Sequence, residues 1–259
     1  MTRRVPVLIY HGLTSGAEGP DVQPDKYWVP DESFRAQLGL VWSGGHRTAL
    51  LGELWHDPAR SGQGPSPIVL TFDDGRASDY ACAFPLLLES RARAEFFVNT
   101  ATIGRPGHLD WSQMREMHRA GMSFQSHGHH HVAMVRLTDR QIEWQLVTSK
   151  ARLEDGLGAR VEFIAVPYGL ASRRILHAAL RVGYRGVCTS RHWPARPGAT
   201  VVNRAAIHRG TSPRHFARLL RRERGAYLVE LLRGVLTWAP KRLLLRTGRL
   251  PVETMESPA

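Results

Sequence analysis

Residues 67–75 read PIVLTFDDG, an unbroken apolar run that ends in two adjacent aspartates and a glycine. A short apolar run bounded by turn residues is typical of a strand that is buried on both faces, as in parallel sheets. Similar runs occur along the chain, at 5–10 (VPVLIY), 94–99 (AEFFVN), 122–127 (MSFQSH), 161–169 (VEFIAVPYG), 184–190 (YRGVCTS) and 201–207 (VVNRAAI). We therefore predict a strand at each of them.

Segments with the apolar spacing of helices separate these strands, at 31–45, 78–91, 110–121, 138–158, 172–183 and 212–225. The clearest is 138–158, where Thr138 and Gln141 predict a capping box and glycines close the helix. In 78–91, Pro85 predicts a kink or a late helix start. Apolar strands that alternate with amphipathic helices indicate parallel βα units, and six or seven units predict an α/β barrel that is closed or nearly closed.

The bulk composition fits one barrel-sized domain. The chain has 259 residues, of which 42% are hydrophobic and 22% charged. The Gly/Pro-rich segments 14–30 and 57–66 are predicted to be loops within that domain. We place the barrel domain at residues 1–225 and a C-terminal basic amphipathic helix and tail at 226–259. That tail could close the barrel or lie on an anionic membrane surface.

The formal net charge is +12, and arginines dominate it. This charge is expected of a solvated basic surface or of a protein with an anionic partner, which could be a nucleic acid, an acidic lipid or a charged glycan. No helix-turn-helix, zinc-finger or RNA-binding motif supports specific nucleic-acid binding. Cys82 and Cys188 are expected to be buried free thiols. The apolar run near the N-terminus is too short for a signal peptide, so the sequence predicts a cytoplasmic protein, peripheral at most to the inner membrane face.

Two strand ends carry unusual side chains. In parallel βα folds the reactive groups gather at the carboxyl ends of the strands. Asp73 and Asp74 end one strand, and two neighbouring carboxylates repel unless a cation lies between them or one is protonated. An ordinary Asp-Asp-Gly turn is the alternative. With a divalent metal, Asp74 could be a ligand while Asp73 stays free as a base.

The stretch FQSHGHHHVAM (124–134) places four histidines after another strand. His127 and His131 are four residues apart, so one helical turn would bring both to one side, a spacing that suits two ligands of one metal. His129 and His130 would point elsewhere. Three protein ligands leave positions open for water and substrate, which is the arrangement of metal-assisted hydrolysis of an amide or ester.

These motifs, in this order, resemble the polysaccharide deacetylases with a NodB-homology domain, carbohydrate esterase family 4. The resemblance runs over about residues 5–190 and includes VPVLIYHG, TFDDG, AEFFVNTATIG, the His-x-x-x-His pair and FIAVPYG. It implies a distorted (β/α)7-type barrel and the removal of N-acetyl, or in some members O-acetyl, groups from sugars. It also implies Asp73 as general base, Asp74, His127 and His131 as metal ligands, and Pro167 and Tyr168 as the third motif, with the Tyr168 N–H in an oxyanion hole.

The sequence departs from the family pattern at two places. Ala165 occupies the position of the arginine that orients the base, as in a branch similar to exopolysaccharide and poly-N-acetylglucosamine deacetylases. Trp193 stands without the aspartate that usually accompanies it, and we expect it to bind substrate. His208, after an apolar strand, is our candidate for the general acid. His11 is the second candidate, and we also expect it to touch substrate.

The sequence therefore predicts a metal-dependent hydrolase that removes acetyl groups, N-acetyl above all, from amino-sugar glycans or their lipid-linked precursors. The expected cofactor is Zn²⁺, with Co²⁺ or Ni²⁺ as alternatives. A glycan-binding pseudo-enzyme that keeps the metal site, and an anionic-polymer-binding protein, are the competing hypotheses.

Overall fold

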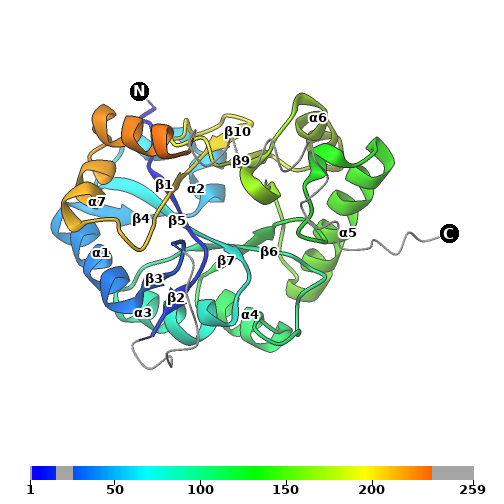
Figure 1. Ribbon diagram of the computed structural model, residues 1–259, viewed down its shortest axis with the longest axis horizontal. Helices are drawn as coiled ribbons and strands as arrows, with labels where there is room; N and C mark the ends of the chain where they lie inside the picture. Colours follow the sequence, from blue (N-terminus) through cyan, green and yellow to red (C-terminus); the bar gives the residue numbers. More distant parts are fainter. Residues whose placement is uncertain (1, 16–25, 235–259) are drawn as a thin grey trace.

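The computed structural model describes residues 2–15 and 26–234. Eight parallel strands form one continuous sheet in the order β10-β9-β8-β7-β6-β5-β1-β11 (Figure 1). Their bounds are β1 (Val7–Tyr10), β5 (Ser66–Asp74), β6 (Glu95–Val98), β7 (Ser123–Ser126), β8 (Phe163–Ala165), β9 (Gly186–Thr189), β10 (Val201–Asn203) and β11 (Ala205–Ala206). The predicted parallel α/β architecture, a distorted and nearly closed barrel, is confirmed.

The barrel almost closes between its two edge strands. β10 pairs with β9 at one edge, β11 pairs with β1 at the other, and Arg204 alone separates β10 from β11 in the chain. The predicted single strand at 201–207 is therefore two short strands that extend opposite edges of the sheet. This arrangement places the Arg204 backbone at the seam of the barrel.

Helices pack outside the sheet or across its end, and Figure 1 shows most of them around the strands. They are α1 (Asp31–Ser43), α2 (Leu51–His56), α3 (Phe84–Glu89), α4 (Trp111–Arg119), α5 (Asp139–Leu157), α6 (Arg173–Val182) and α7 (Pro213–Leu220). The predicted capping box of Thr138 and Gln141 is present, and Gly158 ends α5 with a φ of 64°. Pro85 lies in the first turn of α3, so the late start is confirmed, and a π-helical turn (Asp79–Ala83) precedes it.

The period-two alternation of the strands separates two apolar cores. One set of side chains, including Leu70, Phe72 and Phe96, faces the helices, and the rings of Phe72 and Phe96 are stacked with centroids 5.0 Å apart. The other set, including Val69 and Phe97, fills the barrel interior.

Some elements were not predicted. These are β4 (His46–Thr48), which pairs with the start of β5, helix α2, the 3₁₀ turn Pro58–Gly62, and the small parallel pair of β2 (Leu13–Thr14) and β3 (Val29–Pro30). The helix predicted at 212–225 ends at Leu220, and a second helix occupies 224–234, with Ala226 and Tyr227 buried in the core.

The predicted boundary between residues 225 and 226 falls within that second helix, and residues 235–259 lie outside the described part of the chain. Cys188 is buried as expected, whereas Cys82 is half-buried, and both are free thiols. None of the helices in residues 2–15 and 26–234 has the length and apolarity needed to cross a membrane.

Candidate active site

Asp73 and Asp74 end strand β5 at the mouth of the barrel. Neighbouring residues on a strand normally face opposite sides. Here the backbone of Asp74 is left-handed, with a φ of 81°, and that of Gly75 follows with a φ of 65°. This turn brings both carboxylates to the strand end, as the sequence predicted.

Asp74, His127 and His131 lie together and form the one cluster of potential metal ligands found among the described residues. The Asp74 Oδ1 atom is 3.4 Å from His127 Nε2 and 3.5 Å from His131 Nε2, and it is buried without a hydrogen-bond partner. Two ligand atoms about 2.1 Å from one tetrahedral ion are separated by about 3.4 Å, so these spacings suit a shared cation. The three side chains therefore fit a divalent metal.

Other contacts orient these three side chains. His127 Nδ1 lies 2.8 Å from the Ala165 carbonyl oxygen, which favours the tautomer that leaves Nε2 free to bind a metal. Arg76 donates to Asp74 Oδ2 at 3.1 Å. No helical turn joins His127 to His131: the chain between them is an irregular loop with Gly128 at a φ of 84°. The expected helical geometry was wrong, although the two rings do meet.

His129 and His130 point elsewhere, as predicted. His129 Nδ1 is 2.7 Å from the Thr100 hydroxyl, and the Gln145 amide lies 3.1 Å from His130 Nδ1. Both imidazoles also contact the ring of Trp144. These two histidines thus help to fix the loop that carries the His127–His131 pair.

Arg204 is the functional residue that the sequence analysis missed. Its guanidinium enters the barrel interior and donates to both carboxylate oxygens of Asp73 at 2.7 Å, and also to the Thr71 hydroxyl at 3.1 Å. Burial alone would raise the pKa of Asp73, but the charge and hydrogen bonds of Arg204, together with His127 and His11, hold that pKa below its usual value. An arginine thus contacts Asp73 from the seam of the barrel, whereas position 165 on β8 is an alanine.

The histidines 11 and 208 occupy different positions. His11 follows β1, the strand next to β5, and Asp73 and Asp74 are among the charges that act on it, while burial lowers its pKa. His208 follows β11, one strand farther from β5, and its imidazole lies 3.8 Å from Glu230. The Tyr27 ring stands between the two imidazoles, with centroids 4.9 Å from His11 and 5.1 Å from His208. The structure thus favours His11 rather than His208 as the histidine that serves the carboxylate cluster.

Tyr168 lies next to the cluster of Asp74, His127 and His131, whereas Trp193 contacts another part of the chain. Tyr168 has a left-handed backbone with a φ of 61°, and its ring packs against that of His131 at a centroid distance of 4.6 Å. Pro167, just before it, is buried. Trp193 packs on the ring of Tyr227 at 6.0 Å, so its expected contact with substrate stays a prediction.

The sequence model of the polysaccharide deacetylase family matches residues 60–187, which include both aspartates, the histidine pair and Tyr168. A relative in Bacillus subtilis, YxkH, is 29% identical over 213 residues, covering 80% of this chain and 70% of its own; its description as a polysaccharide deacetylase is itself an inference.

Two solved structures are also similar. The Streptococcus pyogenes deacetylase PplD, solved in complex with acetate, has a TM-score of 0.78 and 26% identity over 85% of this chain and 99% of its own. The Bacillus cereus polysaccharide deacetylase BC0361 has a TM-score of 0.74 and 26% identity over 84% of this chain and 69% of its own. Barrel, strand-end site and similarity together define a carbohydrate-processing hydrolase. Residues 60–187 carry a polysaccharide deacetylase domain, and this family implies an acetylated polysaccharide as the substrate.

Proposed function

We propose that this chain is a metal-dependent deacetylase that removes N-acetyl groups from amino-sugar glycans. The observation that carries the proposal is the pairing of two sets of side chains. One set, Asp74, His127 and His131, has the spacing of metal ligands, and the other is the Asp73 carboxylate held by Arg204. A single barrel mouth thus offers a metal site and an ionised base side by side.

A divalent ion held by Asp74, His127 and His131 would polarise the acetyl carbonyl and make water more acidic. Asp73 accepts the proton of the attacking water, and Arg204 keeps Asp73 ionised and oriented until then. The water oxygen bonds to the acetyl carbon, and the backbone N–H of Tyr168 donates to the oxygen that becomes negative. The C–N bond then breaks, and His11 passes to the leaving amine the proton that Asp73 took from the water, so that acetate and a free amino sugar result.

The first test measures metal content and acetate release from N-acetylglucosamine oligomers in the same samples. We expect about one metal per chain in the wild type, and His127→Ala to lose both the metal and acetate release. Asp73→Asn should keep the metal and lose nearly all turnover. His177→Ala, on the exposed face of α6, is the matched histidine control and should behave as wild type. A fully active Asp73→Asn would refute the base assignment, and a wild type that takes up no metal after reloading would refute the metal site.

A second comparison tests the general acid. His11→Gln should lower kcat by a factor of about 10²–10⁴, the usual contribution of a positioned proton donor. His208→Gln should change kcat far less, because Tyr27 separates it from the carboxylate cluster. A larger loss in the His208 variant would reverse the assignment.

A further inference from the structure

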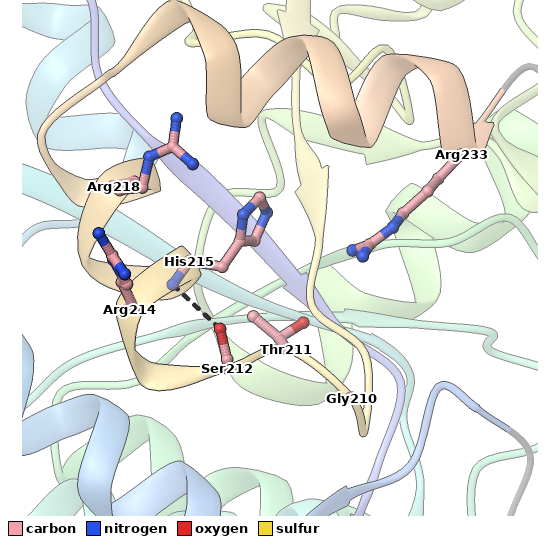
Figure 2. Close-up of a pocket in the computed structure, with 7 residues that line it drawn as sticks. All are labelled: Gly210, Thr211, Ser212, Arg214, His215, Arg218 and Arg233. Carbon is pink, nitrogen blue, oxygen red and sulfur yellow. Dashed lines mark hydrogen bonds between the residues drawn. The ribbon is translucent and has the colours of Figure 1, made fainter.

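A basic hollow of about 270 Å³ opens next to helix α7 (Figure 2). Its lining comes from the loop before α7, from α7 and from the helix at 224–234, and consists of Gly210, Thr211, Ser212, Arg214, His215, Arg218 and Arg233. Pockets for whole drug-sized ligands usually measure about 300–1,000 Å³. The volume therefore suits a single small group rather than a sugar chain.

The charge around the hollow is strongly positive. Between residues 205 and 233 there are seven arginines and two glutamates, Glu223 and Glu230. Glu223 pairs with Arg218 and Arg221, and the buried Glu230 pairs with His215 and Arg233. Arg214 has no ion pair or hydrogen bond within the described part of the chain. Of the three arginines that line the hollow, Arg218 and Arg233 thus pair with acids, whereas Arg214 pairs with none of the described residues.

The hydroxyl groups in the lining can also donate to an anion. The Thr211 hydroxyl accepts from the His208 N–H at 2.9 Å, and the Ser212 hydroxyl accepts from the His215 N–H at 3.2 Å (Figure 2). A hydroxyl that accepts one bond still has its own hydrogen to donate. The first turn of α7 adds little, because Pro213 has no N–H and Ser212 already caps His215. The available donors are therefore the side chains.

The hollow lies at the same end of the barrel as the catalytic groups. Tyr27 links His11 to His208 by ring contacts, and His208 lies 3.8 Å from Glu230, the carboxylate that also binds His215 and Arg233. A chain bound across the barrel mouth, with an acetylated sugar at His11, passes Tyr27 before it reaches the hollow.

Several donors from different directions favour a phosphate group over a carboxylate. A carboxylate is planar and is matched by one guanidinium fork. A phosphate has oxygens on several sides and can accept from donors of more than one residue at once. We propose that this hollow binds a phosphate group carried by the substrate glycan, close to the sugar that loses its acetyl group. The inference rests on the proposed function for the identity of the glycan, whereas the binding of phosphate alone does not.

The test has a binding arm and a turnover arm. In the first, calorimetry measures inorganic pyrophosphate binding to the full chain carrying His127→Ala, so that a metal cannot bind the probe. We expect one salt-sensitive site, weakened about tenfold by Arg214→Gln. Arg140→Gln, an exposed arginine on α5, removes the same charge far from the hollow and should leave the affinity unchanged. Equal weakening by both substitutions, or no pyrophosphate binding, would refute the site.

In the second arm, acetate release is compared between N-acetylglucosamine oligomers with and without a phosphate ester. The KM should be lower for the phosphorylated oligomer, and Arg214→Gln should remove that difference. The phosphorylated oligomer is offered free in solution or linked to a polyprenyl phosphate in phosphatidylcholine vesicles, and the preferred form identifies a polymer or a lipid-linked source. Equal KM values with and without phosphate would refute the substrate assignment. If the site binds pyrophosphate but no oligomer releases acetate, the deacetylase proposal fails while the anion site stands.

Discussion

Asp73 and Arg204 form an ion pair in which both side chains are almost fully buried, with 5% and 1% exposure. Burial of two charges costs more than their attraction returns in many proteins, so such a pair is weak grounds for stability by itself. Its value here is positional. Two parallel hydrogen bonds fix the plane of the carboxylate, and the guanidinium keeps it ionised in surroundings that would otherwise favour protonation.

Replacing Arg204 with Met should leave the Asp73 carboxylate buried without its cation. We expect a loss of about 3–5 kcal/mol in the free energy of unfolding, the usual cost of breaking a buried pair. The double variant Arg204→Met, Asp73→Asn removes both charges and should recover much of that stability without recovering acetate release. Urea midpoints and acetate assays on the same preparations check this. An Arg204→Met protein with the wild-type midpoint would show that the pair does not act as described.

Strand β5 ends in two consecutive left-handed residues, Asp74 and Gly75. These two left-handed residues determine where the Asp74 carboxylate points, because a regular strand would turn it away from the barrel mouth. Space is also short: a Cβ at Gly75 would lie 2.8 Å from the Val98 Cγ1 atom on β6. The glycine is thus required by both its backbone conformation and its close approach to the neighbouring strand.

Gly75→Ala should destabilise the protein and disturb the metal site. Gly64 provides a matched control, since its φ is 60° but a Cβ at that position would have no neighbouring atom within 4 Å. We expect Gly64→Ala to cost about 1 kcal/mol through backbone strain alone, and Gly75→Ala about 2–3 kcal/mol because a collision is added. Thermal unfolding gives both costs, and metal content should fall in Gly75→Ala only. Equal costs in the two variants would exclude the collision.

Over the whole molecule, local patterns in the sequence predicted most of the barrel, since apolar runs, amphipathic spacing and caps are local signals. The TFDDG turn and the His127–His131 pair were found for the same reason. The partner of Asp73 was not found, because Arg204 lies 131 residues away and meets it only when β10 and β11 extend opposite edges of the sheet. His208 was preferred to His11 because RAAIHRG resembles the context in which the family carries its general acid. Both histidines follow apolar strands, so the local pattern does not distinguish them. The order of strands in the sheet distinguishes the two histidines, because β1 lies next to β5 and β11 lies one strand farther away. The order of the strands along the chain does not reveal this arrangement.

The floor of the barrel holds another buried carboxyl group, far from the mouth. Glu95 begins β6, accepts from the Leu51 N–H of α2 at 2.6 Å, and is fully buried. Burial raises its pKa to about 7, although hydrogen bonds from Ser123, Leu51 and Gln125 oppose the rise and the nearby Glu53 adds to it. Because the folded state holds this proton more tightly than the unfolded state, the contribution of Glu95 to stability is greatest below pH 4.5 and declines as the pH rises through 7.

Glu95→Gln keeps the shape of the side chain and removes this titration. Relative to the wild type, the variant should gain stability between about pH 5 and pH 8, by about 3 kcal/mol at most. Urea midpoints of both proteins at the two pH values measure that gain, and taking the difference between the proteins cancels the histidines that titrate in the same range. The Leu51 N–H can still donate to the glutamine carbonyl oxygen, so the link from α2 to β6 persists. A difference between the two proteins that stays constant with pH would show that Glu95 does not bind its proton in this range.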